Sequence, residues 1–211
     1  MTAFLKKFLL LVPILLFVVG INVWVDPGSI LDHGRTERAV AAVLRAGHNC
    51  MAKADLDVRL FRQALIESGE PPEVVVFGSS RAMQVRQSVA PGTRFLNLAV
   101  PNADIEDIVG LHGLLIAGPR YPHTIILCAE PWFFNREVTR SRHIPLSDAF
   151  GRGMRDIGAT GEVTALDYTV WRLTAFEEFV SPAYLRISLR LFPWNALVAP
   201  RSASPVPAWL P

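Results

Sequence analysis

The sequence is short of cysteine, concentrated charge and metal-ligand clusters. Its 211 residues include only Cys50 and Cys128, which are too few for a disulfide framework and lack the Cys-x-x-Cys spacing of zinc or redox sites. Basic residues number 21 and acidic residues 19, and the basic ones are scattered, so we exclude a nucleic-acid-binding surface. Histidine and acidic residues show no metal-ligand spacing. We therefore expect neither a metal nor a cofactor.

Charge is also absent from residues 8–25, an apolar run of 18 residues that approaches the roughly 20 needed to cross a membrane. Lys6 and Lys7 precede the run and Trp24 lies where an interfacial aromatic belongs, so residues 1–7 are predicted to be cytoplasmic. A cleaved signal peptide is the alternative, but residues 22–25 lack the small residues of a cleavage site. We expect a single-pass protein of a bacterial inner membrane with a periplasmic or extracellular C-terminal part.

Residues 26–72 read as a turn-rich connector followed by two packing helices, expected at 36–46 and 55–67. From residue 73 to 155 short apolar runs alternate with helical patterns, which is typical of a parallel sheet with crossover helices. The strands are predicted at 74–77, 95–100 and 124–129. A helix before the third strand is expected to begin near Asn102 or Asp104, because both residue types cap helices.

The C-terminal part is predicted to contain a helical segment followed by a tail without regular structure. Residues 156–192 are predicted to be helical, with Pro182 just inside the last helix. Residues 193–211 are rich in proline and carry no periodic pattern, so we expect a disordered tail.

Polar side chains follow each predicted strand, and the carboxyl ends of parallel strands meet at one edge of a sheet. These residues are Ser79, Ser80 and Arg81 after the first strand, Asn97 and Asn102 after the second, and Glu130, Trp132 and Asn135 after the third. A serine in such a turn can act as a nucleophile beside free backbone N–H groups, or it can simply cap the next helix. Spacing alone leaves both roles open.

Three ordered motifs, "VVVFGSSR", "FLNLAVPNADIED" and "IILCAEPWFFN", follow the earlier "VWVDPGS" and "DLDVRLFRQALIE". Together they resemble the membrane-anchored, exported branch of the SGNH/GDSL hydrolase superfamily, which includes exopolysaccharide O-acetylation proteins and the D-alanyl transfer protein of teichoic acids. The resemblance implies a flavodoxin-like three-layer α/β sandwich with an incomplete sheet. It also implies acyl-ester hydrolysis or acyl transfer on an envelope or secreted polysaccharide, with a membrane-bound O-acyltransferase as a partner.

The resemblance also implies roles for individual residues. Ser80 matches the nucleophile, and its N–H, the N–H of Asn102 and the side chain of Asn135 match the oxyanion hole. Asn102 stands where the family has glycine, which adopts a left-handed backbone more freely. Glu130 stands where related chains carry a donor asparagine, and an ionised carboxylate cannot donate. Arg81 and Trp132 are expected to contact the substrate.

The general base is the main departure from the family. A serine hydroxyl needs a positioned histidine, which the family carries in a late Asp-x-x-His, and the sequence contains no such motif. His143 is the one histidine in a loop that could approach the site. SGNH sheets have about five strands, so the missing strands and the missing motif would both belong to a C-terminal part that this chain lacks.

Two alternatives to catalysis therefore stay open. One is a non-catalytic, membrane-tethered subunit for glycan binding or assembly, in which Trp132, Phe133 and Phe134 stack on sugars. An aromatic run after a buried strand is, however, more often part of a core. The other alternative is an inactive, truncated copy.

Overall fold

The computed structural model describes residues 2–28, 30–31, 34–52, 56–135, 142–191 and 198–200, with side chains from Leu11 onward except at 51–52 and 198–200. Its helices are α1 (Thr2–Val25), α2 (Arg35–Arg45), α3 (Val58–Ser68), α4 (Ile105–Ile116), α5 (Ser147–Asp156), α6 (Ala165–Ala175) and α7 (Pro182–Leu191). Short 3₁₀ turns are η1 (Ala82–Gln84), η2 (Gln87–Val89), η3 (Pro131–Phe134), η4 (Ile144–Leu146) and η5 (Phe176–Val180). The strands are β1 (Cys50–Ala52), β2 (Val74–Gly78), β3 (Phe95–Asn97), β4 (Thr124–Cys128) and β5 (Val198–Pro200).

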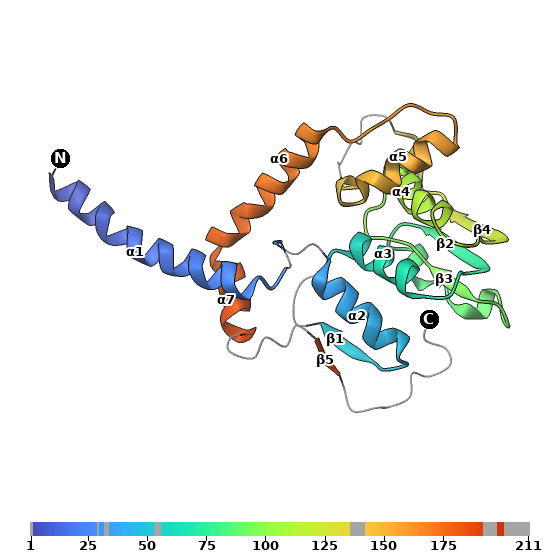
Figure 1. Cartoon of the computed structure of the whole chain (residues 1–211), viewed down its shortest axis with the longest axis horizontal. Coiled ribbons are helices and arrows are strands. Elements are labelled where there is room, and N and C mark those ends of the chain that lie inside the picture. The colour runs from blue at the N-terminus through green and yellow to red at the C-terminus, as the bar shows by residue number, and fades with distance from the viewer. Residues whose placement is uncertain are drawn as a thin grey trace.

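The core is a three-stranded parallel sheet in the order β3-β2-β4 (Figure 1). Val76 of the central strand is aligned with Asn97 of β3 and with Ile126 of β4. All five residues of β2 are buried, as expected for a continuous apolar run in the middle of a parallel sheet. The predicted α/β class with a parallel sheet is confirmed.

Helices cover one face of this sheet. Val75 and Phe77 of β2 pack in a cluster with Leu111 of α4, and α3 and η4 contribute to the same cluster. α4 begins at a capping box in which Asp104 accepts from the N–H of Asp107, and the Asp107 carboxylate accepts from the N–H of Asp104. Of the two predicted caps, Asp104 is therefore the one used. The opposite face of β2 packs Val76 against residues of η1 and of the segment after β3.

α5 is a helix that the sequence patterns did not indicate. It lies against α4 at very close range, because both helices carry glycine at the contact (Figure 1). A Cβ on Gly113 of α4 would overlap the carbonyl oxygen of Ala149, and a Cβ on Gly153 of α5 would overlap the carbonyl oxygen of Val109. Glycine is required at these two positions by the backbone contact.

β4 is the outer strand of the sheet on the side away from β3. Among the described residues it pairs only with β2, and Ile125 and Leu127 are 38% and 50% exposed. In the described part of the chain β4 is thus an edge strand without a further strand beside it. Such edges expose unpaired backbone groups and apolar side chains together.

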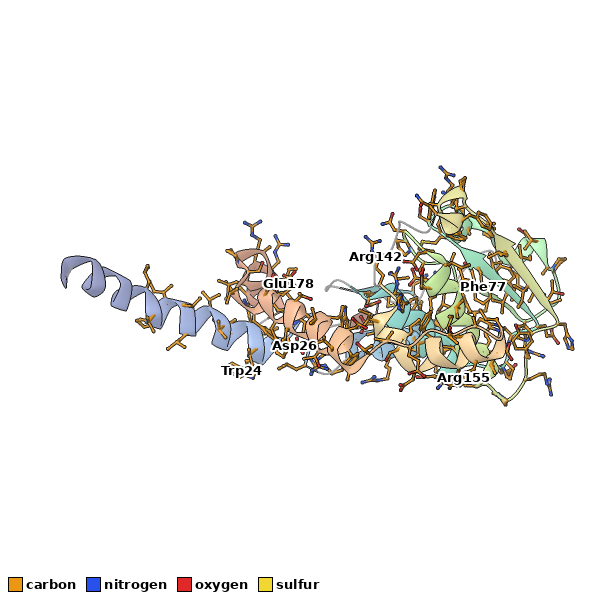
Figure 2. The ribbon with its side chains drawn as sticks, turned by 90° about the horizontal axis from the view of Figure 1, so that it is seen from above. Trp24, Asp26, Phe77, Arg142, Arg155 and Glu178 are labelled. Atoms are coloured by element: carbon orange, nitrogen blue, oxygen red, sulfur yellow. The ribbon has the colours of Figure 1, made fainter. Side chains whose placement is uncertain are left out.

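α1 extends away from the sheet, and its C-terminal end meets α7 and η5 (Figure 1). Asn22 donates to the carbonyl of Phe179 at 2.8 Å, and the Tyr184 hydroxyl bonds to Asp26 at 3.1 Å. Figure 2 shows Trp24, Asp26 and Glu178 at this junction, well separated from Phe77 in the sheet. Within the part of the chain whose side chains are described, no helix is both long and apolar enough to cross a membrane.

Most of the predicted C-terminal tail, residues 193–211, lies outside the described residues. Of this segment the structure describes β5, which pairs antiparallel with β1. The helical prediction for 156–192 corresponds to α6, η5 and α7, and Pro182 is the first residue of α7 as predicted.

Candidate functional site

The turn after β2 presents two serines to different surroundings. Glycine is required at position 78, because φ is +156° and because a Cβ there would lie 2.5 Å from the Cβ of Ala82 and 2.9 Å from that of Cys128. Ser79 is buried, at 1% exposure, whereas Ser80 is exposed. η1 follows with Arg81 at its N-cap and without a side-chain cap, so neither serine has the capping role that spacing had allowed.

Glu130, after β4, binds both neighbours of Ser80. The Ser79 hydroxyl donates to Oε1 of Glu130 at 2.7 Å, and a guanidinium nitrogen of Arg81 lies 3.0 Å from Oε2. The Glu130 side chain is 7% exposed and that of Arg81 is 77% exposed. Glu130 is thus an acceptor and not an oxyanion donor, in keeping with its charge, and Arg81 forms an ion pair at the edge of the site.

Trp132 joins this cluster to the loop after β3. Its indole N–H donates to the carbonyl of Ala103 at 2.9 Å, and the Arg81 guanidinium carbon lies 5.8 Å from the ring centroid. The rest of the aromatic run divides between core and surface, because Phe133 is 6% exposed and Phe134 is 78% exposed. The stacking surface proposed from the sequence is therefore limited to Trp132 and Phe134.

Asn102 adopts the left-handed conformation that its glycine-like position requires. Its φ is +50°, a region that asparagine enters more readily than most side chains. The N–H of Val100 donates to the carbonyl of Gly78 at 3.1 Å, which holds the start of this loop against the end of β2. Asn97 fixes the neighbouring turn by donating to the carbonyls of Ala82 and Val85 at 2.8 and 2.9 Å, which is a structural role.

Asn135 and His143 complete the set of predicted site residues. Asn135 is exposed directly after η3, on the same loop as Glu130 and Trp132. His143 precedes η4 and packs its ring on Phe150 of α5, with 4.5 Å between the centroids. Burial lowers the pKa of His143, and its Nδ1 is enclosed without a partner in the described structure. Hydrogen bonds bring together the Ser80, Asn102 and Glu130 loops, whereas the described ring contact of His143 is with Phe150.

The other described histidines do not supply a base for Ser80 either. His112 of α4 bonds to Asp156 and Tyr121, and His123 precedes β4 at the amino end of the sheet, where its N–H donates to the carbonyl of Glu73. His48 follows α2. In the described ranges, Ser80 has no histidine at hydrogen-bonding distance.

A second group of charges lies beneath the loop after β3 and is structural. Arg59 of α3 binds Asp107 through two hydrogen bonds of 2.6 Å, and both residues are buried. Burial, followed by the charge of Asp107, raises the pKa of Asp104 to about 6. Among the described residues no cluster of histidine, cysteine and carboxylate side chains has the arrangement of a metal site.

A separate cavity of about 420 Å³ lies between α3, α4, α5 and α6. Gln63, Asp148, Arg152 and Tyr168 contribute its polar lining. Its lining includes Pro145 and Leu146 of η4, in the connection after β4, but none of Ser80, Asn102, Glu130 or Trp132, so this cavity is distinct from the cluster around Ser80.

No protein-family model matches this chain, and no curated protein or solved structure is significantly similar to it. The SGNH resemblance therefore rests on the sequence motifs, and a functional assignment has to rest on the carboxyl edge of the sheet.

Proposed function

We propose that this protein acts in serine-dependent acyl-ester hydrolysis or acyl transfer on an envelope or secreted polysaccharide, as an SGNH-like protein. The observation that carries the proposal is the placement of Ser80. It is exposed at the carboxyl end of the central strand, between two residues that are both tied to Glu130. In open α/β sheets ligands bind at this edge.

In the proposed reaction the Ser80 hydroxyl attacks the carbonyl of an acyl ester, the ester C–O bond breaks, and the alcohol leaves with a proton as the acyl-enzyme forms. A sugar hydroxyl or water then attacks the acyl-enzyme, takes the acyl group and releases Ser80. Backbone N–H groups of Ser80 and Asn102 and the amide of Asn135 are the proposed oxyanion donors. The left-handed backbone of Asn102 supports its part in this set. The hydroxyl proton needs a base that joins Ser80 in the working complex. His143 is the candidate from this chain, and it would have to leave its contact with Phe150.

The membrane setting belongs to the same proposal. We infer that α1 anchors the chain in a bacterial inner membrane, with the sheet on the periplasmic or extracellular side. The uncharged residues 8–25 support this inference, as do the exposed side chains of Leu11, Leu16 and Phe17 on α1 and the 72% exposure of Trp24. A membrane-bound O-acyltransferase is the proposed acyl donor, and a flavodoxin-like three-layer sandwich is the proposed complete fold.

The proposal is tested by labelling the detergent-solubilised full chain with a fluorophosphonate probe and locating the modified serine by mass spectrometry. We expect modification at Ser80, its loss in Ser80→Ala, and matching loss of p-nitrophenyl acetate turnover. Ser88→Ala is the matched control, because Ser88 is also an exposed serine and also follows β2 in the sequence, in η2. Labelling and turnover that are equal in wild type and Ser80→Ala would refute the nucleophile.

The second candidate function is non-catalytic glycan binding at the same edge. Two observations favour it: no histidine of the described ranges lies beside Ser80, and Arg81, Trp132 and Phe134 offer a partly exposed cationic and aromatic surface. Under this function, Phe134→Ala weakens retention on acidic polysaccharide columns at least fivefold while Ser80→Ala has no effect. Unchanged retention of Phe134→Ala would exclude this function.

A further inference from the structure

The segment from Glu130 to Trp132 touches the loops that follow both neighbouring strands. One end of the segment accepts the Ser79 hydroxyl and pairs with Arg81, and the other end donates from Trp132 to the carbonyl of Ala103. Ala103 directly follows Asn102, just as Ser79 and Arg81 directly flank Ser80. This segment therefore bonds to neighbours of Ser80 and Asn102, and among the described residues it makes no hydrogen bond to Ser80 or Asn102 themselves.

Glu130 makes stronger hydrogen bonds to its neighbours than Trp132 makes to Ala103. Its side chain is 7% exposed, and its two oxygens are divided between a buried hydroxyl at 2.7 Å and an exposed guanidinium at 3.0 Å. A hydrogen bond to a charged acceptor is shorter and stronger than a neutral one. Because residues 79 and 81 are both held, the residue between them has little freedom to turn inward. The exposure of Ser80 follows from this arrangement.

We propose that Glu130 is a positioning residue, which holds the Ser79–Arg81 turn so that the Ser80 hydroxyl projects from the sheet edge. Trp132 plays the matching part for Asn102 through Ala103. Reactivity of Ser80 therefore depends on a carboxylate that does not touch the substrate. This inference rests on the proposed function, since it assigns Glu130 a part in the reactivity of that same serine.

The test compares Glu130→Ala, Ser79→Ala, the double variant, and Glu130→Gln in the full chain. Both single alanine variants break the same hydrogen bond, so each is expected to slow fluorophosphonate labelling of Ser80 at least tenfold. The double variant should be no slower than the worse single one, because the two changes act on one contact. Glu130→Gln keeps an oxygen acceptor for Ser79 and should label within threefold of wild type.

A second readout does not depend on the chemistry of Ser80. The N–H of Ala82 donates to the carbonyl of Ser79 at 3.0 Å, so loosening of residue 79 should expose it. We expect amide hydrogen exchange in the peptide covering residues 79–85 to speed up at least tenfold in Glu130→Ala and Ser79→Ala. Peptides from α3 should not change. Glu162→Gln is the matched control, because Glu162 is exposed and remote from this turn.

The outcomes separate the two proposals. Slower labelling with faster exchange, and a non-additive double variant, would support the positioning role. Wild-type labelling in Glu130→Ala, or losses in the double variant that multiply, would overturn it. If wild-type Ser80 is not labelled, the proposed reaction is refuted, and unchanged exchange at residues 79–85 would then overturn the positioning role independently.

Discussion

The buried ion pair between Arg59 and Asp107 makes a quantitative prediction for stability. Asp107→Asn removes one charge and leaves the Arg59 guanidinium, whose side chain is 10% exposed, without its bidentate partner. Removing one member of a buried pair costs about 3–5 kcal/mol, because the remaining charge is neither hydrated nor paired. Domains of ordinary size unfold with about 5–15 kcal/mol, so the expected loss is about a fifth of the total or more.

The assay is urea unfolding of the full chain in detergent, followed by circular dichroism, for Asp107→Asn, Arg59→Met and the double variant. We expect the double variant to recover part of the loss, since it leaves neither the Arg59 guanidinium nor the Asp107 carboxylate unpaired, although Asp57 and Asp104 lose the cation beside them. Glu73→Gln breaks the half-exposed pair with Arg94 and serves as the control, with a midpoint close to wild type. A loss below about 1 kcal/mol for Asp107→Asn, or a double variant as unstable as that single variant, would refute this reasoning.

Three other predictions concern single sites. The pKa of Asp104 rises from 3.8 to about 6 on folding, so its contribution to stability is complete below pH 3.8 and is lost as pH rises through 6. Going from pH 4 to pH 7, the Asp104→Asn variant should therefore gain about 2 kcal/mol relative to wild type, measured by urea unfolding at each pH. Gly78→Ala should destabilise the protein by about 2–4 kcal/mol, because it adds overpacking to backbone strain. Gly92 has φ of +76° and open space around it, so Gly92→Ala should cost only the strain, about 1–2 kcal/mol in the same assay. Tyr184→Phe removes the hydroxyl that bonds to Asp26 and should raise hydrogen exchange in α7 at least tenfold without affecting the sheet.

Each of these three predictions has a clear contrary result. Parallel pH profiles for wild type and Asp104→Asn would show that the carboxyl ionises normally when folded. Equal losses for the two glycine variants would show that space around Gly78 does not matter. Unchanged exchange in α7 would show that the Tyr184 hydroxyl does not hold that helix.

Elements with strong local signals were predictable from the sequence. The apolar runs located β2, β3 and β4, and an acidic cap located the start of α4. α5 was missed because its pattern lies in glycines, which carry no hydrophobic signal. Gly110 and Gly113 in α4 and Gly151 and Gly153 in α5 were the available sign of close helix packing. Glycines indicate close helix packing only when it is known which two helices pack together, and the sequence of one helix does not show its partner.

The site was predictable at the level of the sheet edge but not of its hydrogen bonds. The parallel direction of the predicted strands placed the loops of Ser80, Asn102 and Trp132 at one edge, and the hydrogen bonds among their neighbours agree. From the sequence, Glu130 stood out only as a residue that cannot donate to an oxyanion. Its partners, Ser79 and Arg81, lie about 50 residues earlier in the chain, so the sequence did not show these bonds. The sequence did contain one sign of this ion pair: a carboxylate follows one predicted strand, and a cation follows the strand beside it.

The junction between α1 and α7 has a consequence for how the chain is made. Asn22 and Asp26 are 0% and 4% exposed, and their partners Phe179 and Tyr184 follow more than 150 residues later. A growing chain leaves the ribosome N-terminal end first, so Asn22 and Asp26 lack these two partners until η5 and α7 have been synthesised. Docking of η5 and α7 then supplies both partners in a step that follows synthesis of the sheet. The C-terminal end of α1 thus reaches its final surroundings only after segments far along the chain have been made.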